Sequence, residues 1–575
     1  MSHRTVIEVF DQVARDHGQS VAMRVKRNGA WQSWTWQMYH DQARAAAKGM
    51  IKLGLEPTQG VSIIGYNSPE WFIADVAAIL AGGVPAGIYT TNSPEQCHYI
   101  AFHCDASIAV VENAEQLAKF KAIRKDLPKL KAIVMMSGSD DDEGIYSWDE
   151  LLEIGRGEDD APLQARMDAQ KPEDLCTLIY TSGTTGPPKA VMISHLNITW
   201  TAGATAEAIS AQTGQCLLSY LPLSHIAEQL VSLHAPMQFA GNVAFAESLD
   251  LLGDNLREIR PHHFLGVPRV WEKIQAKMEA AGAQNSPLKK KIAAWARKQG
   301  LAGGYAEQAG RSKPFFYGLA NKLVFSKVRE KLGLDRCKMQ ITSAAPISKS
   351  TLEFFLSLGL PIYEVYGMSE CSGPATISLP HRYKTGKAGF CLPGTELKLT
   401  EGENEICMRG PHVFMGYLKN EEDTAKALDP EGWLHSGDVG TIDSDGFLKI
   451  TDRIKDLLIT AGGENIAPQL IEGQLKSIPA VSQAIVVGDR RKFLAALLTL
   501  DPEKIANETE KAGSSAKTVA EAAACDTFKA YLQKQVDVVN QTLARVQTVK
   551  KFTIVPEDFT VEGGELTPTM KLKRS

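Results

Sequence analysis

The sequence predicts an α/β protein with a large N-terminal domain of largely parallel or mixed sheets and helices, and a small α+β domain behind it. Up to about residue 450, short apolar runs alternate with helical stretches, which is typical of βα units. The pattern then changes to two hairpin-like strands and helices rich in Ala, Lys and Glu. A chain of 575 residues is long enough for more than one domain. We expect the domains to be residues 1–451 and 452–575.

Individual elements follow from composition and spacing. Val6, Val9, Phe10 and Val13 mark one face of a short N-terminal helix. Ser68-Pro69 provides a cap and a first-turn proline for another helix. The expected buried strands are LCTLIY (175–180), LLSYL (217–221), HFLGV (263–267), MQIT (339–342) and PIYEVYG (361–367). In the second domain, AIVVGD (484–489) and FLAALLTLD (493–501) are expected to form a hairpin.

Composition excludes several classes of protein. The formal net charge of −5 gives no overall positive field, so no nucleic-acid partner is expected. Nine cysteines without a C-x-x-C pair indicate neither a zinc ribbon nor a disulfide framework, which fits a cytoplasmic protein. The longest apolar candidate, VAAILAGGVPAGIY (76–89), is interrupted by glycines and a proline. We therefore expect no membrane span.

The clearest local signal is YTSGTTGPPK (180–189), directly after an expected strand. Glycines let backbone amides approach an anion closely, hydroxyls donate to phosphate oxygens, and a lysine adds positive charge. The composition predicts a loop that holds a triphosphate. It is not a Walker A loop, because that motif continues Gly-Lys-Ser/Thr where this sequence has Gly186-Pro187-Pro188.

This string resembles the signature loop of the adenylate-forming superfamily, which contains acyl-CoA synthetases, firefly-type luciferases and peptide-synthetase adenylation domains. In that family the loop is a mobile clamp over the β- and γ-phosphates of ATP. The resemblance implies that Thr184 and Lys189 take part in catalysis and that Thr184 contacts Mg²⁺. It implies phosphate contacts from Thr181, Ser182, Gly183, Thr184, Thr185, Gly186 and Lys189.

Further strings resemble the family's motifs in the family's order. LPLSHIAEQ (221–229) points to His225 near the substrate carboxylate, although an isolated histidine of this kind is more often a satisfied core residue. SAAPIS (343–348) resembles the turn on the adenine side. IYEVYGMSE (362–370) resembles the next motif, in which Tyr366 would stack on adenine and Glu370 would hold Mg²⁺. The resemblance implies that the nucleotide is lined by Ser343, Ala344, Ala345, Glu364, Val365, Tyr366, Gly367, Met368 and Ser369.

The remaining motifs lie toward the C-terminus. GWLHSGDVG (432–440) resembles the ribose motif, with Asp438 accepting from both ribose hydroxyls. TDRIKDLLITAGGENIAP (451–468) resembles the hinge and the loop after it. The resemblance places Arg453 at the ribose or phosphate, Lys455 at the hinge, and Gly462 and Gly463 beside the pantetheine arm of CoA. Paired glycines also simply make turns.

ELTPTMKLKR (565–574) resembles the terminal motif that carries the adenylation lysine. The alignment selects Lys571. Lys573 remains an alternative, because Met570 stands where the family more commonly has glycine.

Several strings look like the bubblegum-type long-chain synthetases: YGMSECSGPATIS (366–378), KTGKAG (384–389), HVFMGYL (412–418), LLITAGGENIAP (457–468) and ELTPTMKLKR. This resemblance implies an AMP-forming long-chain fatty acid–CoA ligase that uses ATP with Mg²⁺ and takes CoA as cosubstrate. The alternative is an acyl-adenylating enzyme with another acid or a carrier-protein acceptor. A P-loop ATPase is not favoured, because the Walker A lysine–hydroxyl pair is absent.

Peripheral membrane contact stays open. Lys289, Lys290, Lys291, Arg297 and Lys298 surround Ile292 and Trp295, and Phe316, Leu319, Leu323 and Val324 form a stripe beside Lys322, Lys327 and Arg329. Such helices either lie on an anionic bilayer or pack as core with a solvated face.

Overall fold

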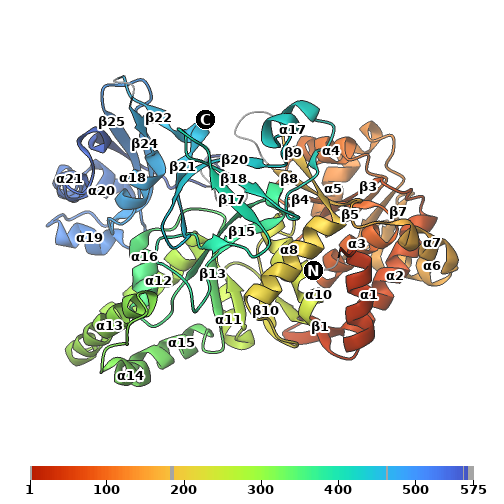
Figure 1. The fold of residues 1–575 in the computed structure, drawn as a ribbon, viewed down its shortest axis with the longest axis horizontal. Helices are drawn as coiled ribbons and strands as arrows, with labels where there is room; N and C mark the ends of the chain where they lie inside the picture. Colours follow the sequence, from red (N-terminus) through yellow and green to blue (C-terminus); the bar gives the residue numbers. More distant parts are fainter. Residues whose placement is uncertain (1–2, 182–186, 462–463, 561–562, 567–575) are drawn as a thin grey trace.

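The computed structural model describes residues 3–181, 187–461, 464–560 and 563–566. Figure 1 shows two large sheets with helices packed around them, a small four-stranded sheet near the middle, and a smaller α+β unit at one end. This arrangement confirms the predicted α/β class. The small unit has its own apolar core, in which Phe528, Leu532 and Val536 are fully buried.

The first large sheet has the order β19-β9-β8-β4-β3-β5-β6-β7. Its pairs are parallel from β8 to β7, whereas β9 runs antiparallel to both β8 and β19. Its strands are β3 (Gly60–Ile64), β4 (Val84–Ile88), β5 (Ile108–Val111), β6 (Ala132–Met135), β7 (Ile145–Ser147), β8 (Leu175–Thr181), β9 (Lys189–Ser194) and β19 (Gly416–Tyr417).

The second large sheet has the order β16-β15-β14-β13-β12-β10-β11-β1-β2. It is parallel from β14 to β1 and antiparallel at both edges. Its strands are β1 (Val21–Arg27), β2 (Ala30–Thr35), β10 (Cys216–Ser219), β11 (Asn242–Phe245), β12 (His263–Leu265), β13 (Met339–Thr342), β14 (Tyr363–Met368), β15 (Gly373–Ile377) and β16 (Phe390–Cys391).

The other sheets are smaller. The antiparallel four-stranded sheet consists of β17 (Glu396–Leu399), β18 (Glu405–Arg409), β20 (Leu434–Ile442) and β21 (Leu448–Arg453). The C-terminal unit contains β22 (Leu458–Ile459), β23 (Asn465–Ile466), β24 (Val481–Val487), β25 (Leu494–Leu500) and β26 (Val549–Val555). Strands β24 and β25 form the expected antiparallel hairpin, and β26 joins β25 in parallel.

The helices cover the sheets. Those of the N-terminal part are α1 (Val6–His17), α2 (Trp36–Lys52), α3 (Pro69–Leu80), α4 (Pro94–His103), α5 (Ala114–Ile123), α6 (Trp148–Arg156), α7 (Ala161–Ala169), α8 (His195–Ala208), α9 (Ile226–Glu228), α10 (Ala235–Phe239), α11 (Leu252–Ile259), α12 (Pro268–Ala283), α13 (Pro287–Gln308), α14 (Tyr317–Ala320), α15 (Ser326–Leu332), α16 (Lys349–Leu356) and α17 (Glu421–Ala427). The small unit has α18 (Pro468–Leu475), α19 (Ile505–Lys511), α20 (Val519–Ala524) and α21 (Asp526–Asn540).

The expected elements are present with adjusted ends. The N-terminal helix buries Val6, Val9, Phe10 and Val13, and Ser68 caps α3 by accepting from the Trp71 amide at 3.2 Å. All five expected N-terminal strands occur, but β10 and β12 stop two residues early and β14 starts two residues late. Prolines lie just outside these ends, at 222, 268 and 361. Because proline donates no hydrogen bond to a sheet, the strands do not extend through these positions.

Helix α8 links the end of β9 to the segment before β19. Ser194 and Asn197 form a capping box, in which the Asn197 amide donates to Ser194 Oγ at 3.1 Å. The Asn197 side chain also donates to the carbonyls of Pro411 and Val413, both at 2.8 Å. These bonds position the chain that enters β19.

The small unit contacts the N-terminal part through a seam of polar residues, which we call the interdomain seam: Arg269 and Glu272 on α12, and Lys476, Ser482 and Asp558. Arg269 lies 3.3 Å from Asp558 and donates to Ser482 at the same distance. Lys476 pairs with Glu272 at 3.3 Å. Lys476 directly follows α18, so its pair with Glu272 joins the end of α18 to α12.

Helices long and apolar enough to cross a bilayer do not occur within the described ranges.

Close helix packing depends on small residues in α2 and α6. A Cβ at Gly155 would lie 1.7 Å from the Ala45 carbonyl oxygen, which is far inside van der Waals contact. We expect Gly155→Ala to lower the free energy of unfolding by about 1–3 kcal/mol, because the two helix backbones must separate. Urea denaturation followed by circular dichroism measures this. Gly157→Ala is the control, since a Cβ there has no neighbour closer than 3.4 Å; equal losses in both variants would contradict the packing argument.

Candidate active site

The two ends of the predicted phosphate loop lie side by side in the first sheet. Thr181 closes β8 and Lys189 opens β9, and the two residues are register partners. The Thr181 hydroxyl donates to the Lys189 carbonyl at 3.4 Å. Ser182, Gly183, Thr184, Thr185 and Gly186 lie outside the described residues, so their phosphate contacts remain predictions.

Lys189 is directed toward the segment that follows β19. Its ammonium lies 2.7 Å from a carboxylate oxygen of Asp423 on α17 and 5.0 Å from the ring centre of Tyr417. The hydrogen bond from Lys189 lowers the pKa of Asp423. The lysine is about one-third exposed, so it remains accessible to an anionic ligand.

Tyr417 connects this lysine to the predicted Mg²⁺ ligand. Its hydroxyl donates to Glu370 Oε1 at 2.8 Å, while its ring faces the Lys189 ammonium. Burial first, and the Glu370 carboxylate second, keep the pKa of Tyr417 above its usual value, so the hydroxyl is a donor at neutral pH. The structure thus brings Lys189 and Glu370, which are far apart in sequence, onto the same tyrosine.

Glu370 suits a hard cation. It lies in the short helical turn η4 (Ser369–Cys371) and is only 8% exposed. Within the described part of the chain, Oε1 receives the Tyr417 bond and no hydrogen bond is donated to Oε2. A buried carboxylate with one oxygen held and the other available fits Mg²⁺, which prefers oxygen ligands.

The predicted ribose residues form a second cluster. Asp438 on β20 and Arg453 on β21 are cross-strand partners, and Arg453 Nε lies 2.9 Å from Asp438 Oδ1. The hydroxyl of Tyr366 on β14 donates to Asp438 Oδ2 at 2.8 Å. Both Tyr366 and Asp438 are less than one-tenth exposed. Stacking of the Tyr366 ring on adenine stays a prediction, but its hydroxyl is committed to Asp438.

The turn before Asp438 is anchored by Glu405, which the sequence analysis did not identify. Glu405 Oε1 accepts from the Gly437 amide at 2.8 Å, and Oε2 lies 2.8 Å from His435 Nδ1. The Asp438 amide donates to Ser436 Oγ at 3.0 Å. Glu405, Cys407 and His435 also place one ligand atom each within 4.8 Å of one another, and the hydrogen bonds among them and to the Gly437 amide account for this grouping. Glu405 is therefore a positioning residue.

The adenine-side turn is tied to β14. Ser343 Oγ donates to the Val365 carbonyl at 2.9 Å, and Ala344 has φ +73°, which a residue with a Cβ adopts at a cost. Gly367 allows a close backbone approach, because a Cβ there would lie 1.8 Å from the Gly373 carbonyl oxygen. Ala345, Met368 and Ser369 adjoin these residues in the same two segments.

Glu364 lies in the same strand as Tyr366. It accepts from the Gly386 amide at 2.7 Å, and burial raises its pKa to about 8. Because Glu364 accepts a hydrogen bond from a backbone amide, we assign it a structural role in the segment that is predicted to line the nucleotide.

His225 sits where the two large sheets meet. It caps α9, and its Nδ1 accepts from the Ala227 amide at 3.1 Å, which leaves the proton of the neutral ring on Nε2. The loop before it packs on β4, where a Cβ at Gly87 would lie 2.7 Å from Ser224 Cα. Three residues on, burial raises the pKa of Glu228 to about 7, and Ser219 of β10 donates to it at 2.6 Å.

The C-terminal predictions are covered in part. Lys455 is exposed in the short turn η5 (Ile454–Asp456), immediately after β21. Its neighbour Asp452 is buried and accepts from the Gln469 amide at 3.1 Å, which joins β21 to α18. Gly462, Gly463 and Lys571 lie outside the described residues, as does the alternative Lys573.

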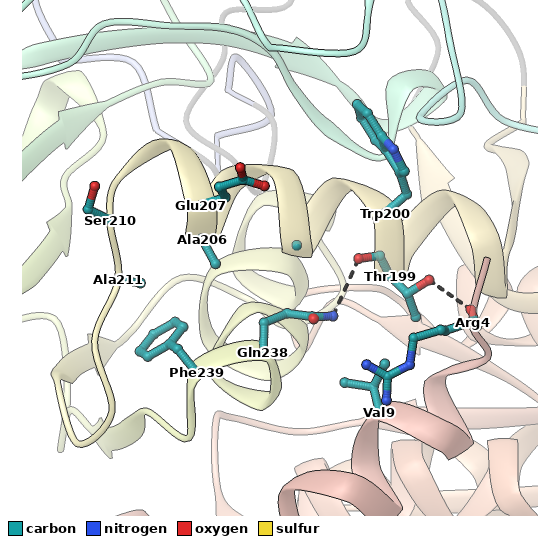
Figure 2. A pocket seen from close by; sticks show the side chains of 11 residues that line it. Arg4, Val9, Thr199, Trp200, Ala206, Glu207, Ser210, Ala211, Gln238 and Phe239 are labelled. Carbon is teal, nitrogen blue, oxygen red and sulfur yellow. Dashed lines mark hydrogen bonds between the residues drawn. The ribbon is translucent and has the colours of Figure 1, made fainter. Parts of the chain in front are cut away.

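A separate open pocket of about 510 Å³ lies between α1, α8 and α10 (Figure 2). Gln238 donates to the Thr199 carbonyl at 3.4 Å, and the Thr199 hydroxyl donates to the Arg4 carbonyl at 2.8 Å. None of the sequence-predicted site residues lines it. The pocket is therefore distinct from the nucleotide clusters described above.

Tyr417 and Asp423, the two residues that contact Lys189, were not predicted from the sequence, and the reason is the same for both. Tyr417 lies in HVFMGYL (412–418), which the sequence analysis used only for its sub-family resemblance. Nothing in the local pattern indicates that β19 pairs with β9, and that pairing is what brings Tyr417 and Asp423 to Lys189.

Comparison with known proteins identifies this assembly. Residues 10–418 match the family model for AMP-binding enzymes, and residues 455–561 match that for the AMP-binding enzyme C-terminal domain. The chain is 46% identical to the long-chain-fatty-acid–CoA ligase ACSBG2 of Xenopus laevis, over 99% of this chain and 82% of that protein. It is 42% identical to ACSBG1 of Homo sapiens, over 99% and 83%.

Solved structures share the fold at low sequence identity. The anthranilate CoA ligase AuaEII in complex with anthranoyl-AMP superposes with a TM-score of 0.75 at 18% identity, covering 100% of this chain and 98% of that one. The adenylation domain of a carboxylate reductase from Mycobacterium chelonae gives 0.77 at 21%, covering 99% and 88%. The predicted fold and family resemblance are confirmed: this chain belongs to the AMP-binding enzyme family, as a relative of the bubblegum-type long-chain-fatty-acid–CoA ligases.

Proposed function

We propose that this protein is an AMP-forming ligase that activates a long-chain fatty acid with ATP and then transfers the acyl group to coenzyme A. The observation that carries the proposal is the joining of Lys189 and Glu370 through Tyr417, beside the cluster of Tyr366, Asp438 and Arg453. The names of the relatives support the long-chain acid and the CoA acceptor.

The first step forms a bond between a carboxylate oxygen and the α-phosphorus of ATP. The bond from the α-phosphorus to its bridging oxygen breaks, and pyrophosphate leaves with the electron pair. Since both reactants are anions, the site must supply positive charge and directed donors. Lys189, the amides and hydroxyls of residues 181–186, and Lys571 would provide them.

Glu370 and Thr184 would hold Mg²⁺. When bound, Mg²⁺ supplies positive charge against the phosphate oxygens. Tyr417 fixes one oxygen of Glu370, so the carboxylate keeps a single orientation toward the nucleotide. His225, with its proton on Nε2, would donate to the acid's carboxylate side.

Asp438 would orient the nucleoside. Its two oxygens are already held by Tyr366 and Arg453, so it faces the ribose in a defined rotamer. The backbone turn that carries it is held in turn by Glu405 through the Gly437 amide.

The second step is attack of the CoA thiol on the acyl carbonyl carbon of acyl-AMP, with loss of the thiol proton and departure of AMP. The small unit would rotate about Lys455 between the steps, so that Lys571 serves the first and the Gly462-Gly463 loop serves the second. Such a rotation must open the interdomain seam, whose pairs are partly exposed.

Nucleotide products test the proposal directly. With ATP, Mg²⁺ and palmitate, we expect AMP and pyrophosphate to accumulate over many turnovers only when CoA is present. If AMP stays stoichiometric with enzyme in the presence of CoA, the adenylation step would stand, and an acceptor other than CoA would have to be assigned. ADP, or no consumption of nucleotide with any acid, would overturn the assignment.

Tyr417→Phe tests the link between Lys189 and Glu370. Loss of a hydrogen bond to a charged group costs about 1.5–3 kcal/mol, so we expect adenylation to slow roughly 10- to 100-fold. The Mg²⁺ concentration for half-maximal activity should also rise, because Glu370 is no longer held. Tyr531→Phe removes a similar 2.8 Å bond to Glu508 in the small unit and serves as the control. An unchanged Mg²⁺ requirement in Tyr417→Phe would refute the positioning role.

Lys571→Ala should separate the half-reactions. Adenylation is expected to fall roughly 10²–10³-fold, by analogy with the loss of an oxyanion donor. CoA transfer from supplied acyl-AMP should persist. Gly463→Leu should do the reverse, because a side chain there obstructs the pantetheine arm. Pyrophosphate exchange and thioester formation measure the two steps, and equal loss of both in Lys571→Ala would contradict the two-role assignment.

A further inference from the structure

An exposed apolar face covers the N-terminal half of α13 and the segment from residue 315 to 323. Six large apolar side chains contribute, with these exposed fractions: Leu288 68%, Ile292 39%, Phe315 93%, Phe316 51%, Leu319 48% and Leu323 44%. Exposed apolar side chains that gather in one contiguous patch mark interaction surfaces, whereas scattered ones do not.

The side chains form two rows that meet at one ring contact. Leu288, Ile292 and Trp295 follow helical spacing on α13, and Phe316, Leu319 and Leu323 do so through α14 and the helical segment η3 (Asn321–Phe325). The rings of Trp295 and Phe316 lie 6.5 Å apart.

A small core lies beneath the two rows. Ala296, Ala320 and Phe325 are fully buried between α13 and η3, so they account for the packing of these elements. A packed core therefore explains the inner residues and leaves the outer rows without a partner within the described residues.

The same segment is strongly cationic. Residues 287–331 contain eleven Lys or Arg and two Glu, in a chain whose formal net charge is −5. One of the two, Glu307, is already paired with Lys313 at 3.0 Å. Lys289, Lys290 and Lys291 are exposed beside Leu288 and Ile292, and Lys322 is exposed beside Leu323. Figure 1 shows α13 and α14 at the edge of the molecule, apart from the large sheets.

We propose that this face docks on an anionic lipid bilayer. Apolar rows flanked by lysines match a membrane interface, where side chains such as Phe and Leu enter the acyl boundary and cations meet phospholipid headgroups. A second copy of this chain would bring the same positive charge to the contact, so self-association is disfavoured. The proposal does not depend on the ligase reaction, although a bilayer is where long-chain acids dissolve.

Vesicle sedimentation with the full-length protein tests the proposal. Wild-type protein should bind vesicles of phosphatidylcholine with phosphatidylserine and bind much less to phosphatidylcholine alone. The triple variant Lys289→Gln, Lys290→Gln and Lys291→Gln should bind the anionic vesicles about 100-fold more weakly. The control carries Lys125→Gln, Lys129→Gln and Lys131→Gln, three exposed lysines just before β6 of the first sheet and outside residues 287–331.

A second variant tests the apolar rows. Leu288→Ser with Phe315→Ser alters two mostly exposed side chains, so folding is spared, and binding should fall roughly tenfold. Absence of wild-type binding to anionic vesicles, or equal binding by the two lysine triples, would overturn the proposal. A dimer in sedimentation velocity that Phe315→Ser abolishes, without vesicle binding, would instead assign the face to self-association. AMP formation measured on the same preparations reports separately on the ligase reaction.

Discussion

The hydrogen bond from Tyr417 to Glu370 links the two large sheets of the N-terminal part. Glu370 follows β14 of the second sheet, Tyr417 belongs to the edge strand β19 of the first, and Lys189 starts β9, the strand beside β19. Placing a cation, a carboxylate and a hydroxyl together in this way addresses the central difficulty of acyl activation, which is the approach of two anions. This contact depends on β9, which runs antiparallel to β8 on one side and to β19 on the other and so brings Lys189 beside Tyr417.

Support for the site extends well beyond the groups that would touch nucleotide. Glu405 holds the Gly437 amide, Ser436 holds the Asp438 amide, and the Asn197 side chain holds the strand entry before Tyr417. Each of these bonds fixes backbone, so the orientation of the reactive side chains does not rely on long flexible rotamers alone. The four-stranded sheet that carries Asp438 ends at Arg453, and the turn η5 with Lys455 follows immediately, so the predicted ribose residues and the expected hinge are neighbours along the chain.

The sequence predicted most of what local pattern encodes. The fold class, the strand β13 at its observed ends and the cap of α3 follow from hydrophobic spacing, β-type composition and proline position. His225, Glu370 and Asp438 could be predicted as site residues because their motifs are contiguous strings, and their roles stay predictions. Tyr417 and Glu405 were not found, because their roles arise from strand pairing across long separations. Tyr366 shows the same limit: its strand was predicted, but the bond from its hydroxyl to Asp438 depends on how β14 meets β20.

The interdomain seam has a consequence for how the enzyme responds to its solution. Its contacts are ion pairs and hydrogen bonds between partly exposed side chains, Arg269 with Asp558 and Lys476 with Glu272. Exposed pairs contribute little individually and are weakened by dissolved ions, whose screening length is about 8 Å at physiological ionic strength. The orientation of the small unit is therefore expected to shift with ionic strength. If the two half-reactions use different orientations, as proposed, the surrounding electrolyte would shift the balance between them as well as the substrates do.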